Sequence, residues 1–341
     1  MPRRPSSAPY PALSANALTV LRARYLARNA RGTICETPDQ LFGRVARDLA
    51  SAERGYPPAL RQPRLAHRYE DLMRRLDFLP NSPTLMNAGR PLQQLAACFV
   101  LPVEDSLESI FDAVKSQALI HQSGGGTGFS FSRLRPQGDR VATTNGHASG
   151  PVSFMRVFNS ATDVIKQGGT RRGANMGILR VDHPDILDFI TLKETPGEMT
   201  NFNLSVGLTN RFMRAVARHQ SYPLINPRTG QCVRRIPATL VFDRLVQAAW
   251  RSGEPGVLFL DTINRANPTP ELGTIEATNP CGEQPLLAYE SCTLGSINVA
   301  HFASRTGKQT TIDYRRLADV IPLTVRLLDH VIDRCRFPLE A

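Results

Sequence analysis

The chain has 341 residues, of which 41% are hydrophobic and 21% charged, and its formal net charge is +11. This composition is typical of a soluble globular protein, and no apolar run approaches the about 20 residues that a membrane-spanning helix needs. Six cysteines are too few for a secreted disulfide scaffold, so we expect reduced thiols and a cytoplasmic location. The positive charge suits phosphate-bearing partners, but the basic residues form no tract, which argues against a specific nucleic-acid interface.

The N-terminal 35 residues contain no acidic side chain and carry six arginines. Mitochondrial transit peptides share this composition. However, Leu18, Leu21 and Leu26 follow a helical period, and the chain continues directly into structured sequence. We therefore predict a disordered basic tail over residues 1–13 and an N-terminal helical domain over residues 14–78.

Two helices are predicted within that helical domain. The first begins after Thr37, which can cap the helix while Pro38 takes the first helical position and Gln40 closes a capping box. The second is predicted over residues 65–76.

From residue 79 onwards, strand-like and helix-like segments alternate. A buried strand is predicted over residues 96–101, and the helix that follows is predicted to be capped by Asp105 with Glu108 as its capping-box partner. Another amphipathic helix is predicted to begin at Pro151 and to stop at Gly168-Gly169.

The rest of the chain continues this alternation. Strands are predicted over residues 176–181, 203–208 and 257–260, with helices over residues 185–193 and 240–251 between them. The last helix is predicted to run from Asp313 towards Arg334, with an interruption at Pro322. Strands separated by helices predict an α/β fold for this region.

The sequence Asn279-Pro280-Cys281-Gly282-Glu283 is the most informative feature of the chain. Proline and glycine on either side of a cysteine predict a tight loop that presents the thiol on rigid backbone. The Asn279 amide and the Glu283 carboxylate can reach the same small volume, which suits radical or nucleophilic chemistry with the carboxylate as general base. The alternative is a surface turn that contains a chance cysteine.

Two further cysteines lie in strand-like segments, Cys98 within residues 96–101 and Cys292 shortly after the Cys281 motif. Buried cysteines in strands usually act as small hydrophobic residues. A redox role requires adjacent strands, with Cα atoms about 4.4–6.8 Å apart so that a disulfide can form without strain. The sequence leaves both interpretations open.

Two glycine-containing segments could contact a ligand. Residues 124–128 fit neither the Walker A nor the dinucleotide-binding spacing, but they allow a close approach of backbone. Residues 167–173 form a loop with Arg171 and Arg172, which suits contact with a base or a phosphate. For these arginines, the alternative is a solvated helix terminus.

Together these segments resemble the catalytic large subunit of ribonucleotide reductases, and most closely the class II branch, which depends on adenosylcobalamin. The resemblance runs from residue 36 to the C-terminus and includes the spacing from Cys281 to Cys292. It rests on motifs at residues 36–38, 81–89, 97–98, 123–136, 167–177 and 279–285. It implies an N-terminal helical unit followed, over residues 79–341, by the first part of a ten-stranded α/β barrel with a finger loop near residues 279–283.

The resemblance implies a role for each residue of the Cys281 motif and for the other two cysteines. Cys281 would carry a transient thiyl radical and remove the 3′ hydrogen of a ribonucleotide, while Glu283 accepts the 3′-hydroxyl proton and Asn279 holds the substrate. Loss of the 2′-hydroxyl as water would draw two electrons from Cys98 and Cys292, which end as a disulfide. Adenosylcobalamin would generate the radical. No protein-held metal is predicted.

The resemblance also implies two nucleotide sites. Substrate would be contacted by Ser82, Ala97, Cys98, Gly126, Asn279, Pro280, Cys281, Gly282 and Glu283. A deoxynucleoside triphosphate or ATP would bind as allosteric effector near Asp105, Arg133, Arg135 and Arg171, at a homodimer interface. The helices beginning near Asp105 and Pro151 would supply that interface, although their apolar faces fit an internal core equally well.

Family members are considerably longer than this chain, and their second half completes the barrel and adds a phosphate-binding loop. We therefore expect a second polypeptide to supply that half, unless the chain is a split or truncated product. A thioredoxin-like protein would reduce the cysteine pair after each turnover. Two rival interpretations remain: a class I subunit whose radical comes from a separate metal-containing subunit, and a nucleotide-binding dimerisation module without turnover.

Overall fold

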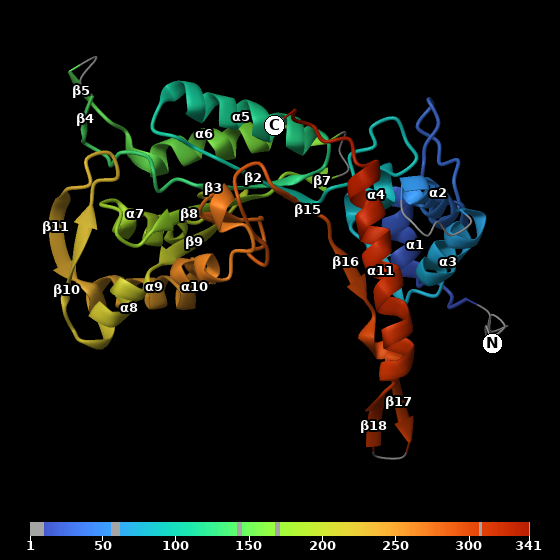
Figure 1. Ribbon diagram of the computed structural model, residues 1–341. Helices are drawn as coiled ribbons and strands as arrows, with labels where there is room; N and C mark the ends of the chain where they lie inside the picture. Colours follow the sequence, from blue (N-terminus) through green and yellow to red (C-terminus); the bar gives the residue numbers. More distant parts are fainter. Residues whose placement is uncertain (1–9, 56–61, 142–144, 168–170, 307–308, 341) are drawn as a thin grey trace. The chain divides into compact units, whose positions relative to one another are not determined.

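The computed structural model describes residues 10–55, 62–141, 145–167, 171–306 and 309–340. Contacts divide the chain into two compact units (Figure 1): Met1–Ala97 with Thr293–Pro338, and Cys98–Cys292 with Leu339–Ala341. The domain boundary expected after residue 78 stays a prediction. None of the helices in the described ranges is long and apolar enough to cross a membrane.

The first unit is mainly helical. Its N-terminal elements are α1 (Ala15–Val20), the π-helical η1 (Leu21–Tyr25), α2 (Pro38–Ala50), η2 (Ser51–Gly55), α3 (Gln62–Arg74), β1 (Phe78–Pro80) and α4 (Ser82–Asn87). Its C-terminal elements are β16 (Gly295–Ile297), η5 (Val299–Phe302), β17 (Ala303–Thr306), β18 (Gln309–Ile312) and α11 (Tyr314–Arg334). β1 pairs with β16 in antiparallel register, so the two segments of this unit share a sheet.

The helix start predicted after Thr37 is confirmed, whereas the helix predicted over residues 65–76 begins three residues earlier and ends two residues earlier. The Thr37 side chain accepts from the Gln40 backbone N–H, and the Gln40 side chain accepts from the Thr37 backbone, which completes the capping box of α2. The predicted second helix is α3. Of the predicted N-terminal tail, residues 1–9 lie outside the described residues.

The predicted interruption at Pro322 is wrong, because α11 continues through this residue. A proline inside a helix removes one hydrogen bond and costs about 3 kcal/mol. Contacts beyond Pro322 offset that cost: Leu327 and Val331 are fully buried. Arg326 also pairs with the buried Glu53 carboxylate.

The second unit contains a six-stranded sheet in the order β12-β9-β8-β3-β2-β15. Its strands are β2 (Cys98–Leu101), β3 (Gly126–Ser130), β8 (Asn175–Arg180), β9 (Phe202–Leu208), β12 (Gly256–Phe259) and β15 (Ser291–Cys292). Neighbouring strands from β12 to β2 run parallel, and β15 is antiparallel to β2. The strands predicted over 96–101, 176–181, 203–208 and 257–260 correspond to β2, β8, β9 and β12.

Helices connect the parallel strands, as the α/β pattern predicted. They are α5 (Leu107–Gln122), α6 (Gly150–Val164), α7 (Ile186–Thr191) with η3 (Leu192–Glu194), α8 (Asn210–Ala217), α9 (Ala238–Ser252) and α10 (Leu260–Arg265), with η4 (Pro270–Leu272) after α10. Smaller pairs are β4 (Arg140–Val141) with β5 (Gly146–His147), β6 (Lys166–Gln167) with β7 (Arg171–Arg172), β10 (Ser221–Ile225) with β11 (Cys232–Pro237), and β13 (Ala277–Thr278) with β14 (Pro285–Leu286). The predicted stop of α6 at Gly168-Gly169 is wrong, because the helix ends at Val164 and Lys166–Gln167 form β6.

The predicted cap of α5 is wrong by one residue. Ser106 is the N-cap, and its side chain accepts from the Ser109 backbone N–H. Asp105 does not cap the helix, because its carboxylate is bound by Arg135. Both partners are charged in the bond between the Arg135 guanidinium and this carboxylate, whereas the backbone N–H groups at a helix start are neutral donors.

Side chains on the two faces of the sheet meet different partners. On one face, Phe129 of β3 packs against Phe158 of α6 with ring centroids 4.8 Å apart, and Phe131 contacts both rings. α5 and α6 lie side by side in Figure 1. Alternate residues of β3 point the other way, towards the hairpin of β13 and β14 that carries Cys281. The aromatic core therefore packs against one face of the sheet, and the Cys281 hairpin packs against the other face.

Candidate active site

Cys281 lies at the tip of the hairpin formed by β13 and β14. At its base, Ala277 pairs with Leu286 and Thr278 with Pro285. The Gly282 N–H donates to the Asn279 carbonyl oxygen over 3.1 Å, which closes a tight turn around Cys281. Gly282 has a φ of +87°, a conformation that favours glycine. The predicted tight loop is therefore present, and the Cys281 side chain is exposed.

Asn279 ties the tip of this hairpin together. Its side chain is completely buried. Its Oδ1 accepts from the Gln284 N–H over 2.9 Å, so the carbonyl end of the amide is committed to the hairpin. Its Nδ2 points to Cys98 and donates to the sulfur over 3.9 Å. The amide is thus a direct link between the Cys281 hairpin and the first strand of the sheet.

The glycine-rich segment supports the hairpin by allowing close approach. A Cβ on Gly126 would lie 2.7 Å from Pro280 Cγ, and a Cβ on Gly128 would overlap the Thr278 carbonyl oxygen. Both positions accept only glycine without movement of the hairpin. The sequence predicts a close approach of backbone at residues 124–128, and the group that comes close to Gly126 and Gly128 is the Cys281 hairpin of the same chain.

Cys98 and Cys292 lie directly opposite each other on β2 and β15. Opposed residues in an antiparallel pair have Cα atoms about 4.5 or 5.5 Å apart, which is within the range that a disulfide requires. Both cysteines are buried and unoxidised. The adjacent-strand arrangement that a redox role requires is therefore present.

The surroundings of Cys292 keep this residue in the thiol form. The hydrogen bond with Cys98 raises the pKa of Cys292 far above its ordinary range, and burial raises it further. The negative charge of Glu283, which is exposed two residues after Cys281, acts in the same direction. Protonated thiols are poor nucleophiles, whereas a neighbouring dithiol can give up two electrons and become a disulfide.

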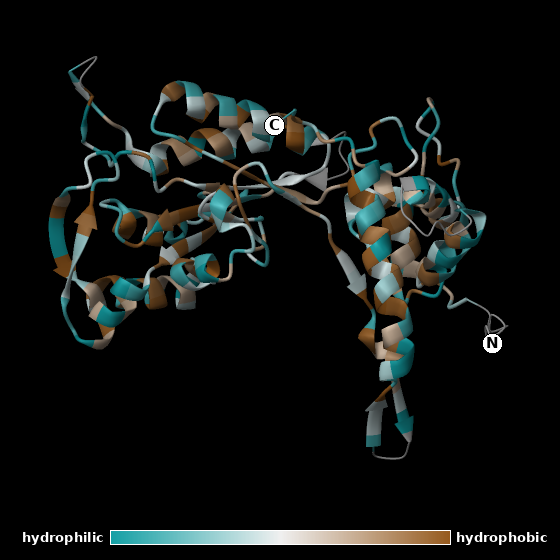
Figure 2. Ribbon diagram, in the orientation of Figure 1, coloured by the Kyte–Doolittle hydropathy of each residue, from teal (hydrophilic) through white to brown (hydrophobic). Residues whose placement is uncertain are grey.

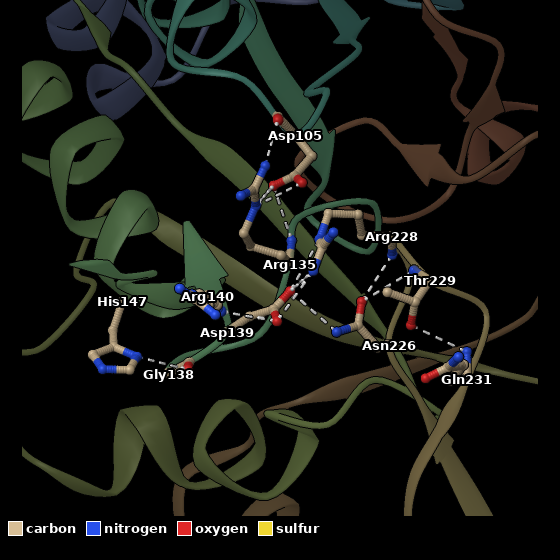
Figure 3. Close-up of polar contacts among 10 residues, drawn as sticks. All are labelled: Asp105, Arg135, Gly138, Asp139, Arg140, His147, Asn226, Arg228, Thr229 and Gln231. Atoms are coloured by element: carbon tan, nitrogen blue, oxygen red, sulfur yellow. Dashed lines mark hydrogen bonds and ion pairs between the residues drawn. The ribbon is translucent and has the colours of Figure 1, made fainter. Parts of the chain in front are cut away.

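Two of the residues assigned to an effector site, Asp105 and Arg135, form an ion pair. Arg135 Nε donates to both carboxylate oxygens of Asp105, over 3.0 Å and 2.8 Å. Figure 3 shows this pair near a second cluster, in which Asp139 accepts from Asn226 and Arg228.

The other two effector candidates have different surroundings. Arg133 pairs with Glu104 and with Glu276, the latter over 2.9 Å. Arg171 belongs to β7, which pairs with β6, and its side chain lies outside the described residues. The described contacts therefore join Asp105 to Arg135, and they join neither Arg133 nor Arg171 to this pair.

Ser82 and Ala97, the remaining substrate-binding candidates, belong to the first unit. Ser82 is the first residue of α4, and its hydroxyl hydrogen-bonds to the Tyr25 hydroxyl over 2.7 Å. Ala97 is buried directly before Cys98.

Sequence reasoning missed two residues that contact the Cys281 hairpin, Met176 and Asn203. Asn203 Nδ2 donates to the Pro280 carbonyl oxygen over 2.7 Å. A Cβ on Gly282 would lie 3.6 Å from Met176 Cε. The available signal was alternation: Phe202, Leu204 and Val206 of β9 are buried, whereas Asn203 between them is exposed. No cluster of three or more His, Cys, Asp or Glu side chains among the described residues could hold a metal ion.

Comparison with known families gives matches over most of the chain. A family model described as ribonucleotide reductase, barrel domain, matches residues 96–341, and one described as ribonucleotide reductase, all-alpha domain, matches residues 12–93. The chain belongs to the ribonucleotide reductase large-subunit family. The helical first segment and the curved α/β sheet are parts of these two domains.

Curated relatives agree with this membership. The chain is 54% identical over 327 residues to a vitamin B12-dependent ribonucleoside-diphosphate reductase of Mycobacterium tuberculosis, across 96% of this chain and 46% of the relative. A protein of the same name from Thermoplasma acidophilum is 46% identical, across 96% of this chain and 50% of the relative. The ribonucleoside-diphosphate reductase large subunit of Trypanosoma brucei brucei is 31% identical across 94% of this chain. The chain spans about half the length of the curated relatives it matches.

Proposed function

We propose that this chain provides the radical-bearing loop and the redox-active cysteine pair of a ribonucleotide reductase, which reduces ribonucleotides to 2′-deoxyribonucleotides for DNA synthesis. The observation that carries the proposal is the buried Cys98–Cys292 dithiol, joined to the Cys281 hairpin by the Asn279 amide. Family membership and the ribonucleoside-diphosphate reductase names of the relatives support the reaction.

In this proposal the chain's own residues divide the reaction between them. Cys281, as a thiyl radical, takes the 3′ hydrogen of the ribonucleotide, and Glu283 takes the proton of the 3′-hydroxyl. Asn279 donates a hydrogen bond through the second N–H of its Nδ2, since the first points to the Cys98 sulfur and its Oδ1 accepts from Gln284. The 2′-hydroxyl leaves as water, and Cys98 and Cys292 supply two hydrogens and two electrons as their disulfide forms. Cys281 then returns the hydrogen to the 3′ carbon.

We further propose adenosylcobalamin as the cofactor, because two of the relatives are named vitamin B12-dependent. When bound, this cofactor supplies the organic radical that converts the Cys281 thiol to a thiyl. The donor chemistry fits: Cys281 is exposed at a rigid tip, whereas Cys98 and Cys292 are buried away from solvent. The class I alternative, with a radical from a separate metal-containing subunit, is less well supported, since the names of these relatives specify vitamin B12.

A deoxynucleoside triphosphate or ATP effector and a homodimer also belong to the proposal. Arg133, Arg135 and Arg171 offer guanidinium groups suited to phosphate. On α5 and α6, Phe111, Leu107 and Val164 are 53%, 64% and 83% exposed. Figure 2 shows hydrophobic and hydrophilic residues alternating along both helices. Exposed apolar side chains on two neighbouring helices favour an interface between subunits over an internal core.

A thioredoxin-like reductant for the disulfide and the remaining strands of the barrel also belong to the proposal. β12 stands at one end of the described sheet, and its Val257 and Phe259 are 39% and 47% exposed, which supports a further strand beside it. The low number of cysteines, six in 341 residues, supports a reducing, cytoplasmic location.

A single-turnover experiment tests this function. The chain, together with the rest of the barrel, is mixed with a ribonucleoside diphosphate and adenosylcobalamin without external reductant. We expect deoxyribonucleotide product and a Cys98–Cys292 disulfide, found by differential alkylation and mass spectrometry. Cys98→Ser should abolish both, whereas Cys232→Ser, on the exposed strand β11, should change neither. Nucleotide binding without product would instead support a dimerisation module without turnover.

A further inference from the structure

Asn203 lies on β9, outside the Cys281 hairpin, and holds that hairpin by a hydrogen bond. Its Nδ2 donates to the Pro280 carbonyl oxygen over 2.7 Å. That oxygen belongs to the peptide bond that joins Pro280 to Cys281, so the contact fixes the main chain directly before the thiol. Because proline has no N–H, this carbonyl is the one main-chain hydrogen-bonding group that Pro280 offers.

The contact is part of a regular arrangement across the sheet. Gly128 of β3 pairs with Met176 of β8, and Met176 pairs with Asn203 of β9. Side chains at one level of neighbouring parallel strands point to the same face. The row therefore meets the hairpin in three places: Gly128 at the Thr278 carbonyl, Met176 beside Gly282, and Asn203 at the Pro280 carbonyl.

The hairpin's own bonds do not fix its position on the sheet. The bond from the Asn279 N–H to the Gln284 carbonyl and the bond from the Gly282 N–H to the Asn279 carbonyl both lie within the hairpin. They preserve its shape. The bond from Asn279 Nδ2 to the Cys98 sulfur, at 3.9 Å, ties the hairpin to β2, but the hairpin can still tilt about that contact. Met176 and Gly128 contact the hairpin by van der Waals packing, which does not favour one orientation. A hydrogen bond, in contrast, prefers one distance and one angle. Asn203 therefore supplies a directional bond from the third strand of the row.

We propose that Asn203 is a positioning residue for Cys281, which sets the height and orientation of the thiol above the sheet. This inference rests on the proposed thiyl function of Cys281. Hydrogen-atom transfer needs the sulfur in contact with the 3′ hydrogen, and a misplacement of about 1 Å can cost a factor of about 100 in rate. Loss of the Asn203 bond should therefore slow the chemical step more than it weakens substrate binding.

Asn203→Asp tests the donor at nearly constant size, because it replaces the Nδ2 group with a carboxylate oxygen that faces the Pro280 carbonyl. In the completed enzyme we expect kcat to fall by about tenfold or more, with KM for the ribonucleotide changed by less than about threefold. Asn203→Ala removes the donor without adding charge and should give the same pattern. Ser205→Ala is the matched control, since Ser205 lies two residues further along β9, beside Gly256 of β12.

Hydrogen–deuterium exchange of the chain gives a second readout that needs no cofactor. We expect the Gly282 and Gln284 amides to exchange faster in both Asn203 variants and at the parental rate in Ser205→Ala. Parental kcat together with parental exchange in the Asn203 variants would overturn the positioning role. A parent enzyme without turnover, or full turnover in Cys281→Ser, would instead refute the proposed function and leave the exchange result to decide whether Asn203 holds the hairpin.

Discussion

Single buried side chains in the first unit set how stability depends on pH, and His330 is the clearest case. It is completely buried, its Nδ1 lies 3.1 Å from the Tyr69 hydroxyl, and its Nε2 lies 3.3 Å from a Glu53 carboxylate oxygen. Burial lowers the pKa of His330 below its ordinary value, although the charge of Glu53 opposes the shift. The folded chain therefore holds this imidazole neutral.

The sign of the resulting pH dependence follows from linkage. An unfolded histidine takes up a proton below about pH 6.5, whereas folded His330 resists protonation until lower pH. We expect the chain to lose stability as the pH falls from about 7.5 to about 5.5, because the unfolded state binds more protons in this window. The His330→Gln variant should be less stable than the parent chain at pH 7.5, but its stability should fall less than that of the parent between pH 7.5 and 5.5. Thermal unfolding at each pH measures both effects. An unchanged slope in the variant would contradict the assignment.

At the scale of elements, the fit between β3 and the Cys281 hairpin depends on the absence of a side chain at Gly128. A Cβ there would overlap the Thr278 carbonyl oxygen, and backbone cannot move aside as a flexible side chain can. Gly128→Ala should lower the free energy of unfolding by about 3 kcal/mol and displace the hairpin. Denaturant unfolding measures the first effect, with Gly256→Ala as the matched control. There the added Cβ would meet only the Ser205 hydroxyl at 3.1 Å and an oxygen at 3.8 Å. Equal decreases in the free energy of unfolding of the two variants would contradict this prediction, because they would show that the hairpin moves away from the added Cβ at little energetic cost.

Elements with strong local signals could be predicted from the sequence, and those that depend on register could not. The capping box at Thr37 and the buried runs of β8 and β9 are local patterns, and they appear where expected. The cap at Asp105 was misplaced because a distant guanidinium, on Arg135, takes the carboxylate. The role of Asn203 depends on the pairing of three strands, which no local pattern reveals.

The candidate site divides in the same way. The hairpin tip at Cys281 could be predicted because proline and glycine mark a tight turn. The sequence alone left open whether Cys98 and Cys292 are neighbours, because they lie 194 positions apart in the chain and such a separation fixes no distance in space. Only the pairing of β2 with β15 brings them opposite each other.

At the scale of the whole molecule, the chain consists of two compact units. It spans about half the length of the relatives it matches. The Cys281 hairpin, the Cys98–Cys292 pair and the residues that support them all belong to the second unit. Cys281 is the exposed thiol of this set, and the other two are buried. The central claim is therefore that Cys281 alone exchanges hydrogen with the radical source, while the buried pair acts later as reductant.

Exchange of hydrogen between water and the 5′ carbon of adenosylcobalamin tests that claim most directly. The S–H hydrogen of Cys281 equilibrates with solvent, so a completed enzyme should wash tritium from cofactor labelled at the 5′ position, in the presence of an effector and without turnover. Cys281→Ser should abolish the washout, whereas Cys98→Ser and Cys292→Ser should retain it. Washout at the parental rate in Cys281→Ser, or its loss only when the buried pair is changed, would contradict the account.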